Sequence, residues 1–241
     1  MAKQKVYDSV AAAVADIPDG ASIFIGGFGH AIDKPQTLLK ALREQGAKNL
    51  TLIGNAAGGM GKMGIGALGG VPFIDEEIVV ENGQVKKVIC SIAGSLVMSK
   101  PNAFERLYRE GKIEMECVPQ GTLAEKIRCG GAGIGGFYTP TGVGTLVDQG
   151  KEKRVLGGRE MLFEEAIRAD YALIRAYKAD TYGNLIFHGV MRSFNAIMAQ
   201  AADVAIVEVD EIVPAGELDP ETIVTPGIYI DRIVLRGKET K

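Results

Sequence analysis

The feature that most constrains this chain is a repeated unit in which a short apolar run ends directly in a glycine loop. Residues 21–25 lead into Gly26-Gly27-Phe28-Gly29, and residues 50–53 lead into a second loop over 54–59. Between them, residues 35–46 have helical apolar spacing, a proline at the start and a glycine at the end. This order of strand, glycine loop, helix and strand predicts an open, mostly parallel α/β sheet. The ligands of such sheets bind outside the carboxyl ends of the strands, where these loops are expected.

The remaining signals extend the same sheet without a linker, a repeat or a low-complexity tract. We expect further strands over residues 85–92, 113–118, 171–176, 184–187 and 204–209 and in the tail, with helices over 6–17, 102–109 and 194–201. Residues 1–241 are therefore expected to form a single domain. The glycine-rich segment 58–70 is expected to cover the ligand site or to pack closely against it.

Composition narrows the class of protein. The net charge is −3 and no basic run is longer than a pair such as Lys86-Lys87, so a nucleic acid partner is not expected. No run of about 18 apolar residues and no signal-peptide core is seen, so we expect a cytoplasmic protein without a membrane span. Cys90, Cys117 and Cys129 form no C-x-x-C pair and are expected to be free thiols. With only two histidines in the chain, no metal site is expected.

The densest turn chemistry lies between residues 115 and 147. Pro119-Gln120-Gly121-Thr122 opens a predicted amphipathic helix, which ends in a glycine cluster before an aromatic Thr-Pro-Thr-Gly loop. Gln120 follows an apolar strand, and its neutral amide can both donate and accept hydrogen bonds. That chemistry suits holding a developing oxyanion or a carboxylate oxygen. A structural cap of the helix is the alternative interpretation of Gln120.

Three other motifs are open to more than one interpretation. Residues 131–136 satisfy G-x-G-x-x-G, but a helix precedes them and Pro140 with Gly142 follows, so no dinucleotide site is favoured. Glu81-Asn82-Gly83 lies in apolar alternation and is predicted to be a hairpin turn, with a catalytic role for Glu81 as the alternative interpretation. His30, Asp33 and Lys34 follow the first glycine loop; they either contact a polar substrate or form a solvated helix entry, with Asp33 favoured by the helix dipole.

Across essentially its whole length, the chain resembles the α subunit of the family I coenzyme A transferases. The matching pieces occur in family order and include Ile17-Pro18-Asp19-Gly20, Gly26-Gly27-Phe28-Gly29, Asn55 with Ala57-Gly58, Pro119-Gln120-Gly121-Thr122-Leu123-Ala124-Glu125, Phe137-Tyr138-Thr139-Pro140-Thr141-Gly142, Phe194-Asn195 and Pro226-Gly227-Ile228-Tyr229. The resemblance implies the α/β fold of this family, which is similar to NagB. It also implies an enzyme that exchanges CoA between an acyl-CoA and a free carboxylic acid.

The resemblance further implies that the active site is shared with a second chain. In this family the nucleophilic glutamate lies in a Glu-Asn-Gly motif of the β subunit, whereas Glu81-Asn82-Gly83 lies in an α-like half. An obligate β partner and an α2β2 assembly are therefore expected, with CoA as a substrate and no permanently bound cofactor. Gln120 would help to form the oxyanion hole and orient the acyl carbonyl. The other residues expected to bind substrate are Gly26, Gly27, Phe28, Gly29, His30, Asn55, Gly58, Gly121 and Phe137.

Four departures from the family pattern fall on the expected substrate loops. They are the loop after Gly29, a missing asparagine next to Asn55, the segment 91–95, and an insertion around 61–77. The Gln120 region is intact, so we expect the chemistry to be kept while the acid has changed. Succinate, acetoacetate, acetate and other short acids remain open. The alternatives are a CoA-thioester or ring-opening hydrolase on the same fold, and a non-catalytic acyl-CoA sensor.

Overall fold

The computed structural model describes residues 4–61, 72–94 and 101–237. Within these residues, the main feature is an eight-stranded sheet in the order β11-β10-β8-β1-β2-β3-β4, with β9 paired to β8. Every pair along this order is parallel, and only β9 is antiparallel. The expected open, mostly parallel α/β sheet is confirmed. Its strands are β1 Ser22–Ile25, β2 Leu50–Ala56, β3 Val85–Ile92, β4 Glu114–Cys117, β8 Ala169–Asp180, β9 Leu185–Ile186, β10 Ala202–Val213 and β11 Arg232–Leu235.

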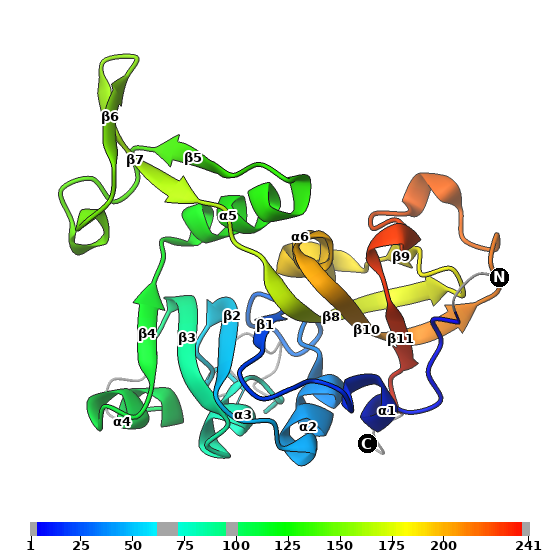
Figure 1. The fold of residues 1–241 in the computed structure, drawn as a ribbon. Coiled ribbons are helices and arrows are strands. Elements are labelled where there is room, and N and C mark those ends of the chain that lie inside the picture. Colours follow the sequence, from blue (N-terminus) through cyan, green and yellow to red (C-terminus); the bar gives the residue numbers. More distant parts are fainter. Residues whose placement is uncertain (1–3, 62–71, 95–100, 238–241) are drawn as a thin grey trace.

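Helices cover both faces of this sheet (Figure 1). One face carries α1 Val10–Val14, α2 Gln36–Gln45, α3 Glu77–Glu81 and α4 Ala103–Arg109, and the other carries α5 Gln120–Ala132 and α6 Ser193–Ala201. Strand β1 contributes to both cores, because Ile23 packs on the side of α1 and α2 while Phe24 packs on the side of α5 and α6. A parallel strand buried on both faces is expected to be apolar, as β1 is over its three buried residues after Ser22. Short 3₁₀ turns are η1 Leu146–Asp148, η2 Gly189–Arg192, η3 Pro220–Thr222 and η4 Gly227–Tyr229.

The order of the strands creates a switch point next to β1. The chain adds β2, β3 and β4 on one side of β1, and later adds β8 on its other side. At such a point, connections leave neighbouring strands in opposite directions and open a crevice at their carboxyl ends. The loop from Gly26 to His30 begins there, directly after β1.

A smaller antiparallel sheet, which the sequence patterns do not predict, extends beyond the main one (Figure 1). It consists of β5 Gly136–Thr139, β6 Lys153–Leu156 and β7 Arg159–Glu165 in the order β5-β7-β6. Lys126 of α5 anchors it by donating to the buried Glu164 carboxylate of β7 at 3.2 Å. The G-x-G-x-x-G motif joins α5 to β5, so no helix follows it, as predicted.

Two local predictions are corrected by the structure. The first helix is shorter than expected, because it begins after Ser9, whose side chain accepts from the Ala12 N–H at 3.1 Å. Glu81-Asn82-Gly83 is a turn, but it joins helix α3 to strand β3 and is not part of a hairpin. Since β2 and β3 are parallel neighbours, a crossover must connect them, and α3 supplies it.

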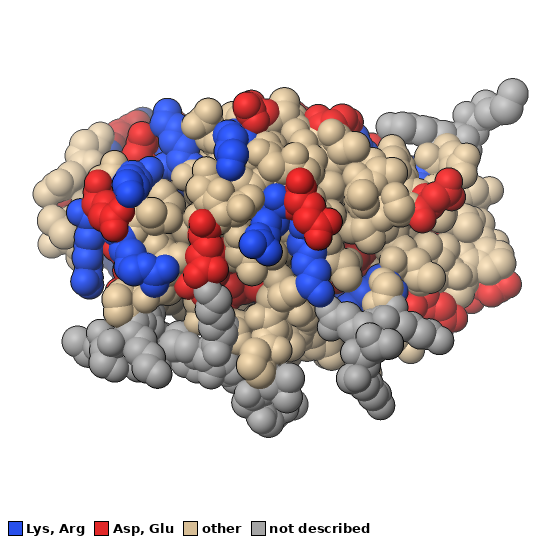
Figure 2. All heavy atoms as spheres, turned by 90° about the horizontal axis from the view of Figure 1, so that it is seen from below, with Lys and Arg blue, Asp and Glu red and all other residues tan. Residues whose placement is uncertain are grey.

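The face formed by α1 to α4, viewed in Figure 2, carries acidic and basic side chains interleaved over its described part. Ion pairs join some of them, for example Arg106 with Glu81 at 3.9 Å. In the described ranges, no helix has both the length and the hydropathy needed to cross a membrane. The segment 58–70 is the one expected to cover the site. Most of it lies within 62–71, outside the described residues.

Candidate active site at the carboxyl edge of the sheet

Gln120 is the first residue of α5, immediately beyond the carboxyl end of β4. Pro119 precedes it in an extended conformation (φ −54°, ψ 137°), which ends the strand and turns the chain into the helix. The Gln120 side chain is exposed, and its Nε2 atom donates to Oδ1 of Asn55 at 2.8 Å. The helix therefore places this amide at the edge of the sheet where the switch point lies.

Asn55 determines which way the Gln120 amide faces. Asn55 belongs to β2, is fully buried, and donates from Nδ2 to the backbone carbonyl of Phe28 at 2.7 Å. Because a carbonyl can only accept, the Asn55 nitrogen must face Phe28 and its oxygen must face Gln120. Gln120 then has to present its nitrogen to Asn55. Its second N–H and its Oε1 make no other hydrogen bond within the described part of the chain, so both are available to a ligand.

Asp33 holds the loop after β1 in shape. Its carboxylate accepts from the backbone N–H of Phe28 at 2.7 Å and of His30 at 3.0 Å. Gly27 adopts φ +89°, and a side chain there would collide with Asp33, whose carbonyl oxygen would lie 2.7 Å from the new Cβ. The solvated helix entry considered from the sequence is wrong, because Asp33 is fully buried and Lys34, also buried, pairs with Glu76 at 2.7 Å.

Asn195 of α6 joins this loop to the other side of the switch point. The residue is fully buried and donates to the carbonyls of Asp33 and Met191, at 2.9 and 2.8 Å. Its Oδ1 accepts from the Arg175 N–H of β8 at 2.9 Å. A Cβ at Gly26 would lie only 1.8 Å from that Oδ1, so glycine is required where the two elements meet. The sequence patterns alone assign Asn195 no role in the site.

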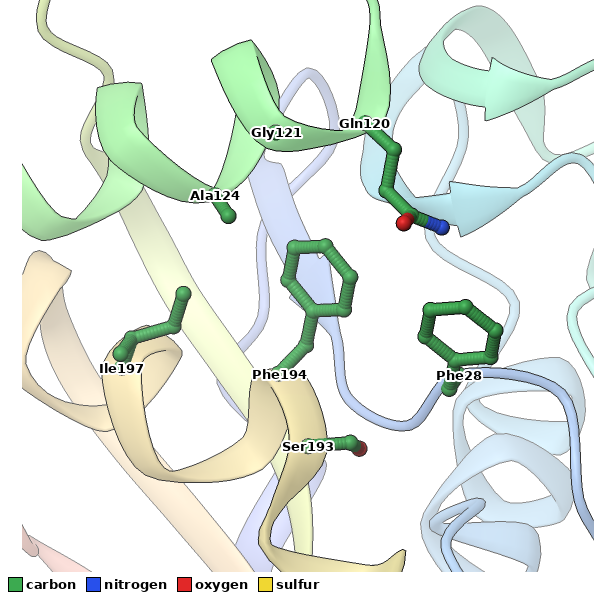
Figure 3. Close-up of a pocket in the computed structure, with 7 residues that line it drawn as sticks. All are labelled: Phe28, Gln120, Gly121, Ala124, Ser193, Phe194 and Ile197. Carbon is green, nitrogen blue, oxygen red and sulfur yellow. The ribbon is translucent and has the colours of Figure 1, made fainter.

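A cavity of about 220 Å³ opens between the first turns of α5 and α6 (Figure 3). The rings of Phe28 and Phe194 stack beside it with centroids 6.4 Å apart and planes inclined by 23°. The Ser193 hydroxyl oxygen is shielded from solvent and has no hydrogen-bond partner among the described residues. The seven lining residues are Phe28, Gln120, Gly121, Ala124, Ser193, Phe194 and Ile197.

The structure brings only some of the expected site residues together. Phe28, Gln120 and Gly121 line the cavity, and Asn55 lies directly behind Gln120. Gly58 instead packs against α3, where a Cβ would lie 2.6 Å from the backbone nitrogen of Glu77. Phe137 is half-buried in β5 and pairs with Glu164, away from the cavity lining. Glu81-Asn82-Gly83 precedes β3 and so lies at the opposite edge of the sheet from Gln120.

Ala124, Ser193, Phe194 and Ile197 are cavity residues that the sequence does not predict. In the sequence, Ala124 and Ile197 look like ordinary apolar positions of two helices. Their shared cavity depends on the packing of α5 against α6, which the sequence spacing does not specify. The proximity of Phe194-Asn195 to the first glycine loop could have been inferred only from the strand order, which puts β8 beside β1.

Comparison with known sequences assigns the family. The sequence model described as coenzyme A transferase matches residues 7–236. The chain is 47% identical to the A-type subunit of the 3-oxoadipate CoA-transferase of Pseudomonas putida, over 95% of this chain and 93% of that one. It is 44% identical to the A-type subunit of the succinyl-CoA:3-ketoacid coenzyme A transferase of Helicobacter pylori J99 (95% and 91% covered). Identity to the alpha subunit of the acetate CoA-transferase of Escherichia coli K12 is 46% (92% and 93% covered).

The solved structures agree on the fold. An acyl-CoA transferase from Escherichia coli O157:H7, determined as a thioester complex with CoA, superimposes with a TM-score of 0.80 at 24% identity. The match covers 99% of this chain, and this chain spans half the length of that transferase. The sheet, the family match and these relatives lead to one conclusion: the chain belongs to the coenzyme A transferase family, as an A-type (α) subunit.

Proposed function

We propose that this chain and a β subunit together exchange CoA between an acyl-CoA and a short carboxylic or 3-oxo acid. The observation that carries the proposal is the Gln120 amide, oriented by Asn55 and open toward a cavity at the start of α5. None of the seven residues lining that cavity is a carboxylate. The nucleophile is therefore expected from the partner, as a glutamate that completes the site on this face.

The proposed reaction proceeds through two covalent intermediates. The partner's glutamate oxygen attacks the thioester carbon, the C–S bond breaks, and CoA thiolate leaves a mixed anhydride. The thiolate then attacks the glutamyl carbonyl and releases the first acid as its carboxylate. The resulting enzyme–CoA thioester is attacked by the second acid's carboxylate. The same two steps then run in reverse order, so the second acid leaves as a CoA thioester and glutamate is restored.

Each attack makes a tetrahedral oxyanion, and this chain supplies groups that can hold it. Gln120 lines the cavity and keeps one N–H without a partner among the described residues, and the first turn of α5 adds the positive end of a helix dipole. Removing one preorganised donor of this kind costs roughly 10²–10³ in rate. Phe28 and Gly121, which line the cavity, would contact the acyl group. The loop that also contains Gly26, Gly27, Gly29 and His30 would bind the substrate beside Phe28, held in shape by Asp33. Contacts from Gly58 and Phe137 remain predictions.

The assembly is also a proposal. The relatives are named as A-type or alpha subunits, which supports a partner chain, and we propose an α2β2 complex. The described cysteines are free, in keeping with a cytoplasmic location. Co-expression with the β chain followed by light scattering would give the stoichiometry. An α chain that does not bind the β chain when the two are co-expressed would contradict this assembly.

Mass spectrometry of the intact chains tests the function. The co-purified complex is incubated with acetyl-CoA, without a second acid and then with a panel of acids. We expect a CoA adduct on the partner that one class of acid discharges. A Gln120→Ala complex should form the adduct roughly 10²–10³ more slowly. Release of CoA that is independent of every acid, with no adduct, would contradict the transferase and indicate a thioester hydrolase. Tight binding without turnover would indicate a sensor.

A further inference from the structure

The cavity beside Gln120 has a polar end and an apolar end. Gln120 and Ser193 provide the polar side chains, whereas Ala124 of α5 and Ile197 of α6 lie at the end away from Gln120, with Phe194 between (Figure 3). No lining residue carries a charge. A volume of about 220 Å³ suits a small molecule rather than a large one.

Three basic side chains on the surrounding elements are paired elsewhere. Lys126, on the next half-turn of α5 after Ala124, donates to Glu164 at 3.2 Å. Lys34 pairs with Glu76 at 2.7 Å, and Arg175 pairs with Asp210 at 2.6 Å. Arg192 precedes α6, is exposed, and does not line the cavity. Within the described ranges, the apolar end therefore has no cation at its wall.

This arrangement bears on whether the acid substrate has one carboxylate or two, which the names of the relatives leave open. One relative is named for 3-oxoadipate, which has two carboxylates, and another for acetate, which has one. If the reacting carboxyl group lies at Gln120, the rest of the acid extends between α5 and α6. A second carboxylate would then be taken out of water against an apolar wall to which the described residues of this chain bring no counter-ion, which is strongly unfavourable.

We propose that the acid accepted by this enzyme is a short monocarboxylic acid whose apolar tail lies between Ala124 and Ile197, and not a dicarboxylic acid. The inference rests on the proposed function, because it places the reacting carboxyl group at Gln120. The physical reason is that burying methyl and methylene groups at this end of the cavity lowers the free energy of binding, whereas burying a charged group there does not.

Matched acids of equal carbon number test the proposal. The αβ complex is charged with acetyl-CoA, and kcat/KM is measured for butyrate against succinate and for hexanoate against adipate. We expect each monocarboxylic acid to be preferred by about 100-fold or more, since a mismatched buried polar group discriminates more strongly than a methylene. Equal rates, or a preference for the dicarboxylic acids, would overturn the inference while leaving the transferase intact. Absence of transfer with every acid would overturn the proposed function and this inference with it.

A pair of variants at one lining position tests the role of this chain alone, because both are compared in complexes with the same β subunit. Ile197→Lys puts a cation at the apolar end, and Ile197→Met keeps a neutral side chain of similar length. We expect Ile197→Lys to shift the succinate-to-butyrate ratio toward succinate by at least about tenfold, and Ile197→Met to retain the preference for butyrate. The same ratio in both variants would show that the tail does not reach Ile197 and would overturn the proposal.

Discussion

The residue on which the site depends most is Asn55, because it fixes the direction of the Gln120 amide. Asn55→Ala removes both the bond to the Phe28 carbonyl and the bond to Gln120. We expect kcat of the αβ complex to fall by about 10- to 100-fold with a smaller change in KM, since the loss is one of orientation. Steady-state kinetics with one donor and one acid would measure this.

Asn82→Ala is the matched control for that prediction. Asn82 also makes side-chain hydrogen bonds, to the Arg43 carbonyl and to Gln84, but it lies at the opposite edge of the sheet. Its replacement should leave kcat unchanged. Wild-type activity in Asn55→Ala would show that Gln120 orients itself without this neighbour.

The three cysteines should differ sharply in reactivity. Burial raises the pKa of the Cys90 thiol to about 12, with smaller contributions from Cys117 and Glu76. At pH 8 only roughly 10⁻⁴ of Cys90 is therefore thiolate, the reactive form, and its thiolate fraction rises only as the pH approaches 12. Iodoacetamide at pH 8 should label exposed Cys117 in the folded chain and spare buried Cys90 and Cys129. Peptide mass spectrometry would measure the labelling of each cysteine. The unfolded chain, in which all three cysteines should be labelled, is the control.

At the scale of elements, the join between the β1 loop and α6 is the least tolerant contact. Gly26→Ala would put a Cβ 1.8 Å from the Asn195 oxygen, which cannot move without losing hydrogen bonds to two other segments. We expect a loss of about 1–3 kcal/mol in unfolding free energy. Gly135→Ala, where a Cβ meets nothing within 4 Å, should be close to neutral in the same urea titration. Equal midpoints for the two variants would contradict the tight join.

The helices and strands that the sequence predicts best are those whose ends and apolar pattern are set by residues within the element itself. The strand predicted over residues 85–92 is β3, and the helix over 102–109 begins with a capping box between Asn102 and Glu105. The β5-β7-β6 sheet escapes prediction because β6 is exposed, β5 is only four residues long, and β6 and β7 mix charged with apolar residues. Its local signal is Gly157-Gly158 between two strand-like runs. The wall of the cavity could not be predicted, because it is formed where α6 packs against α5 and these two helices are far apart in the sequence.

For the whole molecule, the exposed cavity predicts where the partner binds. Phe28 is 40% exposed although its ring stacks on Phe194, and Gln120 and Gly121 are exposed beside it. A glutamate from the partner has to come within about 3 Å of the reacting carbon, which lies next to Gln120 in the proposed reaction. We therefore predict that the β subunit covers the carboxyl edge of the sheet, and not the face of α1 to α4 shown in Figure 2.

Hydrogen–deuterium exchange of the α chain, alone and in the αβ complex, measures that placement. We expect added protection in the Gly26–His30 loop, the first turn of α5 and the start of α6, because these three segments border the cavity. The turn at Asn82-Gly83, at the amino edge of the same sheet, is the internal reference and should exchange equally in both samples. Protection confined to that amino edge would place the partner too far from Gln120 for its glutamate to react there. It would therefore refute the shared site, even if the two chains co-purify.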